Sequence, residues 1–184
     1  MPKLINTPIA GLKIIQLDIF HDERGFFVER FNREKFAALD NALPLDYFQD
    51  NASRSLPRVL RGLHYQNNPQ QAKLVGCTMG RVWDVALDLR PSSPTFGQHF
   101  ATELSIENGK LLFIPAGFAH GFCVLGDDFA DVIYKVDNKY NKDGEGGIVY
   151  NDPDLHIKWP IKNPILSAKD AQLQSFKNYT KSII

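Results

Sequence analysis

Residues 115–122 read PAGFAHGF, and residues 61–66 read RGLHYQ. Each segment places one histidine, His120 or His64, beside glycine and among residues typical of strands and tight turns. Histidine is the side chain whose ordinary pKa best suits proton transfer near neutral pH, and it is also a common metal ligand. The two segments therefore predict a β-rich site built either for proton abstraction or for metal binding.

Short runs with a period of two residues surround these segments. Residues 83–90 alternate in this way, and residues 100–106 repeat the pattern before the turn Glu107-Asn108-Gly109. Further strands are predicted over residues 12–19, 25–31, 111–114, 121–125 and 131–136. Many short strands separated by turns are typical of a sandwich or barrel. The pattern predicts a mainly β fold, a jelly roll (double-stranded β-helix) with a few short helices and a cavity between its sheets.

Helix is expected in two places. Residues 33–39 predict a short helix with Asn32 as its N-cap. Residues 167–176 predict a second helix, in which Ser167 is the cap and Asp170 takes a position like that in a capping box. The polar, glycine-rich residues 138–147 are expected to form a surface loop between strands.

Length and composition narrow the class of protein. The 184 residues suffice for one domain with a real core, so residues 1–184 are expected to form a single jelly-roll domain with a C-terminal helical tail. Lys and Arg number 21, as do Asp and Glu, and this balance argues against a nucleic-acid-binding protein. Cys77 and Cys123 lie in apolar runs, and no secretory signal or membrane-spanning run is recognised. These features predict reduced thiols and a cytoplasmic protein that binds neither nucleic acid nor membrane.

The metal hypothesis depends on the number of ligands. The spacing Pro115-x-Gly117-x-x-His120 resembles the second motif of the cupin superfamily, which uses the jelly-roll fold. The first motif of a metal-binding cupin supplies His-x-His and a later Glu, whereas here Tyr65 and Gln66 follow His64. A metal site of this kind needs three or four protein ligands. We therefore expect no metal, and a metal-dependent cupin enzyme stays an alternative that metal analysis would test.

Proton chemistry without a metal needs a base, a group that stabilises an enolate, and an acid. His64 is the candidate base, and Asp170 is suited to orient it and to stabilise its protonated form. Lys73 at the start of a strand is suited to stabilise an enolate oxygen, and Tyr134 is a candidate acid. If the base and the acid lie on opposite faces of the substrate, the reacting carbon is inverted.

Each of these residues also has a purely structural interpretation. A strand histidine is commonly a satisfied core residue, and Asp170 alone reads as a helix-cap carboxylate. Tyr134 alone reads as a barrel aromatic. Arg24 and Arg61 are suited to bind phosphate through paired donors, but Arg24 and Lys73 also fit solvated surface charges.

Ordered matches to one family run along nearly the whole chain. They are residues 22–29 (DERGFFVE), 49–51 (QDN) with Ser53, 59–64 (VLRGLH), 73–75 (KLV), 84–90 (DVALDLR), 93–97 (SPTFG), 114–122, 134–135 (YK), 151–153 (NDP), 159–160 (WP) and 166–170 (LSAKD). Through these motifs the chain resembles the dTDP-4-dehydrorhamnose 3,5-epimerases and related sugar-nucleotide epimerases. So many ordered matches are far more specific than any single motif.

The resemblance implies an isomerase that inverts C3 and C5 of dTDP-4-keto-6-deoxy-D-glucose, without metal or organic cofactor. His64 would take the proton, paired with Asp170, while Lys73 would stabilise the enolate and Tyr134 would return a proton from the opposite face. Family positions that hold the sugar, the diphosphate or the base are matched by Arg24, Glu29, Gln49, Asp50, Asn51, Arg61, His120, Glu145 and Lys169.

The resemblance also implies a partner and a setting. Family members are homodimers that exchange N-terminal strands, so Arg24 and Glu29 would serve the partner's site. The usual setting is dTDP-rhamnose synthesis for bacterial surface polysaccharide such as lipopolysaccharide O-antigen. The sequence leaves open an epimerase that inverts only C3 or only C5, a 3,4-ketoisomerase on the same fold, and a non-catalytic cupin that binds a sugar nucleotide.

Overall fold

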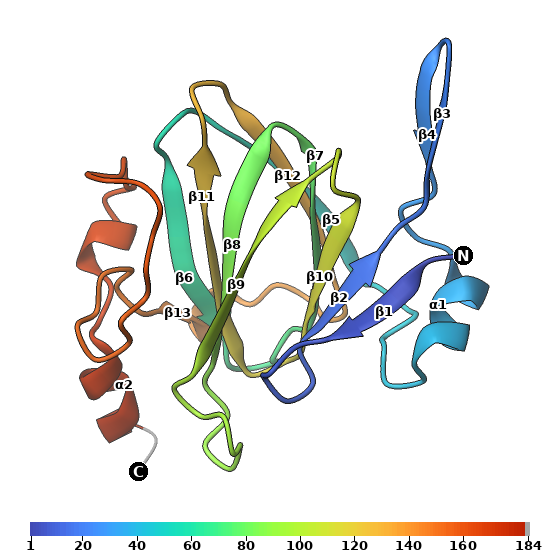
Figure 1. Ribbon diagram of the computed structural model, residues 1–184. Coiled ribbons are helices and arrows are strands. Elements are labelled where there is room, and N and C mark those ends of the chain that lie inside the picture. The colour runs from blue at the N-terminus through green and yellow to red at the C-terminus, as the bar shows by residue number, and fades with distance from the viewer. Residues whose placement is uncertain (183–184) are drawn as a thin grey trace.

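Two antiparallel sheets face each other in the computed structural model, which describes residues 1–182 (Figure 1). The first sheet has six strands in the order β1 (Lys3–Asn6), β2 (Lys13–Gln16), β10 (Lys110–Ile114), β7 (Lys73–Met79), β12 (Ala130–Val136) and β5 (Gln49–Ser55). The second has five strands in the order β13 (Glu145–Gly147), β6 (Leu60–Gln66), β11 (Phe118–Leu125), β8 (Arg81–Asp88) and β9 (His99–Ser105). This is the predicted jelly roll.

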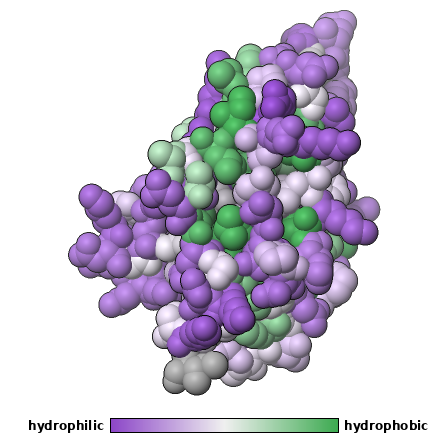
Figure 2. Space-filling view, turned by 90° about the vertical axis from the view of Figure 1, so that its left-hand side faces the viewer, coloured by the Kyte–Doolittle hydropathy of each residue, from purple (hydrophilic) through white to green (hydrophobic). Residues whose placement is uncertain are grey.

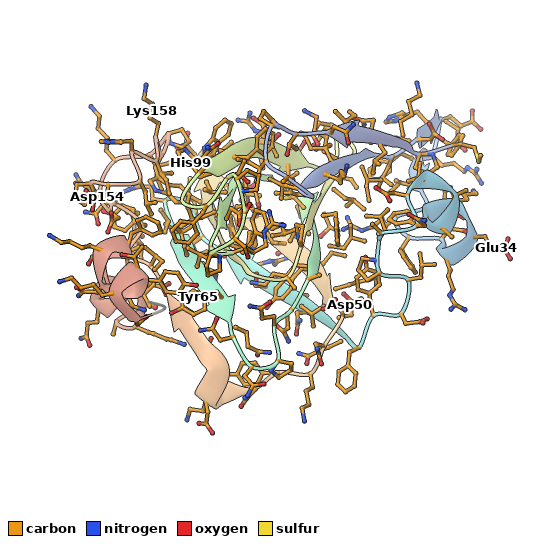
Figure 3. All side chains as sticks on the ribbon, turned by 90° about the horizontal axis from the view of Figure 1, so that it is seen from below. Glu34, Asp50, Tyr65, His99, Asp154 and Lys158 are labelled. Atoms are coloured by element: carbon orange, nitrogen blue, oxygen red, sulfur yellow. The ribbon has the colours of Figure 1, made fainter. Side chains whose placement is uncertain are left out.

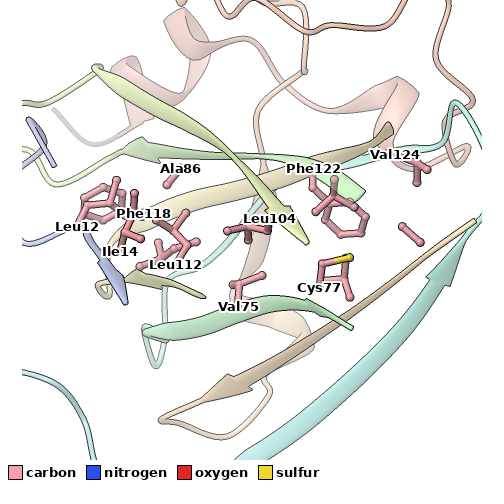
Figure 4. Close-up of a cluster of buried hydrophobic side chains, with 14 of the residues drawn as sticks. Leu12, Ile14, Val75, Cys77, Ala86, Leu104, Leu112, Phe118, Phe122 and Val124 are labelled. Carbon is pink, nitrogen blue, oxygen red and sulfur yellow. The ribbon is translucent and has the colours of Figure 1, made fainter. Parts of the chain in front are cut away.

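Alternation along the strands builds the core between the sheets. Val75 and Cys77 of β7 face Leu104 of β9 and Phe122 of β11 across this space, and all four side chains are buried (Figure 4). Fully burying one such aliphatic or aromatic side chain contributes roughly 1.5–3 kcal/mol to folding. Toward the end where β6 finishes and β7 begins, polar side chains replace the apolar ones and leave a cavity.

Helix α1 (Arg33–Leu39) covers the outer face of the six-stranded sheet. Asn32 is its N-cap as predicted, because its side-chain oxygen accepts the N–H of Lys35. Phe36 is buried against Leu74 and Phe113 of the sheet. The hairpin of β3 (Ile19–Asp22) and β4 (Gly25–Val28) projects away from the body of the molecule (Figure 1).

The C-terminal segment covers the five-stranded sheet, and here one prediction is wrong. In place of a helix over residues 167–176, a 3₁₀ turn η2 (Asp170–Gln172) precedes α2 (Phe176–Ser182). Ser167 does accept the N–H of Asp170, so the predicted capping contact forms. The predicted helix does not continue past Gln172, because Leu173 adopts an extended backbone and packs on Gly147. Gln174 then forms an isolated β-bridge with Ile148.

Several strand limits also differ from the prediction. Residues 12–19 are divided between β2 and β3, because Leu17 and Asp18 belong to neither strand. The strand predicted over residues 25–31 ends at Val28. Residues 138–147 contain a 3₁₀ turn η1 (Lys142–Gly144) and then β13, so the last part of the expected loop is a strand paired with β6. The edge strands β1 and β5 carry little alternation and are not predicted from it.

The surface formed by the C-terminal segment is mainly hydrophilic around a smaller hydrophobic area (Figure 2). Within residues 1–182, the structure contains no helix of the length and apolarity required to span a membrane.

Candidate active site

A cavity of about 310 Å³ lies between the two sheets, at the end where β6 finishes and β7 begins. Figure 3 views the molecule from below and labels Tyr65 of β6, left of centre, and Asp50 of β5, right of centre. The lining comes from both sheets and the loop before β13. It consists of Asn51, Ala52, Ser53, Arg61, His64, Tyr65, Gln66, Gln71, Lys73, His120, Gly121, Phe122, Tyr134, Tyr140 and Glu145.

His64 is bonded to Asp170, which lies 106 residues further along the chain. The distance between His64 Nε2 and Asp170 Oδ1 is 2.5 Å, and the aspartate side chain is only 5% exposed. Burial lowers the pKa of His64, and the carboxylate of Asp170 partly opposes that effect. The imidazole is therefore neutral at neutral pH. With Nε2 directed at a carboxylate, Nδ1 is the nitrogen that can accept a proton.

His120 lies opposite His64 in the register between β11 and β6. Its Nε2 is 2.8 Å and 3.0 Å from the two carboxylate oxygens of Asp84 on β8. Both side chains are buried, so the aspartate fixes the orientation of the second ring as well.

Lys73 and Tyr134 face the histidines from the six-stranded sheet. Burial lowers the pKa of Lys73 to about 8, although Asp84 and Glu145 favour its charged form. Burial raises the pKa of Tyr134, and Arg61 opposes this rise only in part. At neutral pH the cavity therefore holds a cationic lysine, a neutral phenol and a neutral imidazole.

Charged and aromatic side chains form the rim. Arg61 donates from Nε to Ser55 Oγ at 2.9 Å, which holds its guanidinium beside the opening. Lys169 Nζ pairs with Glu145 Oε2 at 2.6 Å, and Tyr140 donates its hydroxyl to the same oxygen at 3.1 Å. Burial, the largest single influence, would raise the pKa of Glu145, but the contacts with Lys169, Tyr140 and His64 together outweigh burial and lower that pKa.

A second cavity of about 330 Å³ adjoins the first on the side of the C-terminal segment. It shares Arg61, His64 and Glu145 with the main cavity and adds Lys169 and Asp170. The rim therefore continues into a second cavity, which carries the cations Arg61 and Lys169 together with the carboxylates Glu145 and Asp170.

Comparison with known proteins assigns the family. The family model described as dTDP-4-dehydrorhamnose 3,5-epimerase matches residues 6–178. The chain belongs to the dTDP-4-dehydrorhamnose 3,5-epimerase family. The epimerase of Shigella flexneri is 49% identical over 94% of this chain and 95% of its own length.

Solved structures agree with this epimerase assignment. The epimerase of Elizabethkingia anophelis has a TM-score of 0.89 at 49% identity, covering 96% of this chain and 97% of its own. The enzyme of Legionella pneumophila, solved with dTDP-4-keto-L-rhamnose, has a TM-score of 0.91 at 46% identity, covering 96% of this chain and 94% of its own. The predicted family, the cupin-like fold and the enzyme class are confirmed.

Most of the residues expected to serve the epimerase lie together. His64, Lys73 and Tyr134 line the cavity, and Asp170 stands behind His64. Asn51, Arg61, His120 and Glu145 also line the cavity, Lys169 lies at its rim, and Gln49 lines an adjoining pocket with Tyr134 and Tyr140.

Three expected residues lie elsewhere in the epimerase chain. Arg24 is at the tip of the projecting hairpin, where it pairs with Asp22 and is 84% exposed. Glu29 pairs with Lys35 at 2.8 Å. Asp50 does not line the cavity but pairs with Lys135 at 2.9 Å, since it alternates along β5 with the inward-facing Gln49 and Asn51.

Tyr140, Gln66, Gln71 and Asp84 are among the residues of the site that sequence reasoning missed. Gln66 stands in the quoted segment RGLHYQ, and Asp84 stands in the matched segment DVALDLR. Their places in these motifs were the signal that could have identified both residues. Tyr140 lies in the polar segment expected to be a plain surface loop. Its aromatic character among polar residues was the available signal.

A metal ion of the kind considered above would need three or four protein ligands gathered in one place. Across residues 1–182, no three His, Cys, Asp or Glu side chains gather as a metal site would require. Independence from a cofactor stays a prediction for this epimerase.

Proposed function

We propose that this dTDP-4-dehydrorhamnose 3,5-epimerase converts dTDP-4-keto-6-deoxy-D-glucose to dTDP-4-keto-L-rhamnose with the residues of the cavity described above. The observation that carries the proposal is the placement of a neutral imidazole and a protonated phenol on opposite sheets, with the half-buried Lys73 on β7, the strand next to that of Tyr134. A base and an acid on opposite sides of a sugar ring are what inversion of a carbon requires.

The reaction conserves its atoms and electrons. His64 Nδ1 takes the proton from the carbon beside the ketone, and the electron pair of the C–H bond moves to the ketone oxygen as an enolate. The ammonium of Lys73 stabilises that oxygen by charge and by hydrogen bonding. Tyr134 then gives its proton to the opposite face of the carbon while the enolate returns to the ketone. Exchange with solvent returns His64 and Tyr134 to their starting protonation states.

The same groups can address both carbons because the ketone at C4 acidifies C3 and C5 alike. The diphosphate and the base supply binding energy away from the reacting centre and hold the ring between the sheets. His120, fixed by Asp84, is suited to donate or accept a hydrogen bond beside the ketone oxygen.

The rim suits the nucleotide part of the substrate. Arg61 and Lys169 offer donors to a diphosphate at the junction of the two cavities. The ring of Tyr140 is 55% exposed at the mouth, and such a ring offers a flat face on which a base can stack. Gln49 and Asn51, bonded to each other at 2.6 Å, are suited to hydrogen-bond the same nucleotide.

We further propose one domain and a homodimer in the cytoplasm, in which the hairpin β3–β4 of each chain reaches the other. Phe20, Phe26 and Phe27 on this hairpin are 60%, 51% and 66% exposed, which is costly for three neighbouring aromatic side chains in a monomer. Exchange of the hairpins would cover these three side chains. It would also bring Arg24 and Glu29 toward the site of the partner chain.

The test is proton NMR of the purified protein with dTDP-4-keto-6-deoxy-D-glucose in deuterated water, without added metal. Deuterium entering at both C3 and C5 is the expected result. Exchange at one carbon alone would replace the proposal with a mono-epimerase, and a product with its ketone at C3 would replace it with a 3,4-ketoisomerase. Complete absence of exchange would contradict the proposed substrate.

A further inference from the structure

Gln66 is a buried amide whose role lies outside the proton chemistry. It ends strand β6, two residues after His64, and it is 8% exposed. Its Nε2 donates to Pro69 O at 2.5 Å and to Lys139 O at 3.0 Å, while its Oε1 accepts the N–H of Asn141 at 2.8 Å. One side chain thus ties the end of β6 to a loop about 73 residues away in the sequence.

The two bonds to that loop fall on either side of Tyr140. Lys139 O and the N–H of Asn141 belong to the residues directly before and after the tyrosine. Fixing both neighbours limits the backbone rotation that would swing the aromatic ring. The ring itself is 55% exposed, and its hydroxyl bonds to Glu145 at the mouth of the cavity.

The chemistry of the contact requires glutamine. Two backbone carbonyls need donors and one N–H needs an acceptor, and a primary amide supplies both donors and the acceptor at once. A carboxylate would accept from Asn141 but would repel the two carbonyls. A methionine of similar length would fill the space and make none of these bonds.

We infer that Gln66 is a positioning residue that holds Tyr140 as a stacking surface for the nucleotide base. The inference rests on the proposed function, because it assumes that a nucleotide occupies the rim. Holding the ring in place before the ligand arrives removes an ordering cost that binding would otherwise meet, and so raises affinity. Gln66 thereby acts on nucleotide affinity through Tyr140, while His64 on the same strand acts on the sugar.

The experiment is calorimetric titration of the full-length protein with dTDP, which lacks the 4-keto-6-deoxyhexose of the substrate and so reports binding of the nucleotide alone. We expect Tyr140→Ala to weaken dTDP binding by about tenfold, as the loss of one stacked base contact would. Gln66→Met should weaken it by a similar factor. Gln66→Met added to Tyr140→Ala should cause less than a twofold further loss, because its effect passes through the missing ring.

Two further measurements separate positioning from general damage. In steady-state assays, Gln66→Met should raise KM by about as much as it raises the Kd for dTDP, with a much smaller fall in kcat. Gln66→Glu should recover dTDP affinity, relative to the unaltered protein, as the pH falls from 8 to 6, because a protonated carboxyl regains one donor. This second variant keeps the test open if Gln66→Met fails to fold.

The outcomes are distinguishable. If the unaltered protein does not bind dTDP, the proposed function and this inference both fail. If it binds dTDP but Gln66→Met binds equally well, or if the two substitutions weaken binding additively, only the inference about Gln66 is overturned. Equal affinity of Gln66→Glu at both pH values, relative to the unaltered protein, would also overturn it.

Discussion

His64 and His120 lie opposite each other on the neighbouring strands β6 and β11, and each bonds through Nε2 to a different aspartate. The partner of His64 arrives from the C-terminal segment, whereas the partner of His120 comes from the adjacent strand β8. The two rings are therefore held by different parts of the fold. Changes to the C-terminal segment should affect the first ring and leave the second in place.

Asp170→Asn should lower kcat by roughly 10²–10⁴-fold, the range expected for loss of general base function. Asp170 favours protonation of His64, while burial opposes it and dominates. Removing the carboxylate should therefore lower the pKa of His64 further. The base is active above its pKa, so the acid limb of the pH–rate profile should move to lower pH. Asp84→Asn is the matched control and should leave that limb in place; an unmoved limb in Asp170→Asn would contradict the pairing.

Lys73 should set the alkaline limb of the same profile. Its pKa is lowered to about 8 by burial, and only the charged form stabilises an enolate strongly. We expect kcat/KM to fall as the pH rises through about 8. Lys73→Arg, which remains charged, should show no such limb in whatever activity it retains. A limb at the same pH in Lys73→Arg would assign it to another group.

Lys73→Met should lose activity and gain stability against unfolding. The lowered pKa means that folding disfavours the charged lysine, so the unfolded chain binds more protons between about pH 8 and 10.5. Stability of the unaltered protein should rise across that interval. At pH 7 the methionine variant should be more stable, on the order of 1–2 kcal/mol, as measured by urea unfolding. A less stable variant would show that the lysine is well compensated in the folded state.

Tyr134→Phe should separate proton removal from proton return. With His64 intact, deuterium should still enter the substrate, but inversion should fall by about 100-fold or more. Proton NMR in deuterated water measures both quantities in one sample. His64→Ala provides the comparison, since it should abolish exchange at both carbons. Normal inversion by Tyr134→Phe would assign proton return to another acid.

Phe26→Ser combined with Phe27→Ser should convert the proposed dimer to a monomer without unfolding it, because both side chains are exposed in the single chain. Light scattering coupled to gel filtration gives the mass. Leu56→Ser is a matched control, being 64% exposed at a turn outside the hairpin, and it should leave the dimer intact. A monomeric unaltered protein would rule out the exchange.

Local pattern was enough to predict much of the fold. Alternation with a period of two residues identified the strands around residues 83–90 and 100–106, because each such strand has one face in the core. Asn32 marked the start of α1, since a cap bonds only to its near neighbours. The ordered motifs located His64, Lys73, Tyr134 and Asp170 through their resemblance to one family.

Other features depend on contacts that cross the sequence. The helix predicted over residues 167–176 is interrupted because Leu173 packs on Gly147, an attraction that no local propensity reveals. The bonds of Gln66 to both neighbours of Tyr140 likewise exist only once β6 and the loop before β13 meet. Residue order along the chain dictated which side chains are present and which strands form. The folded chain decided which of them face each other, because burial and hydrogen bonding act on distance in space and not on separation along the chain.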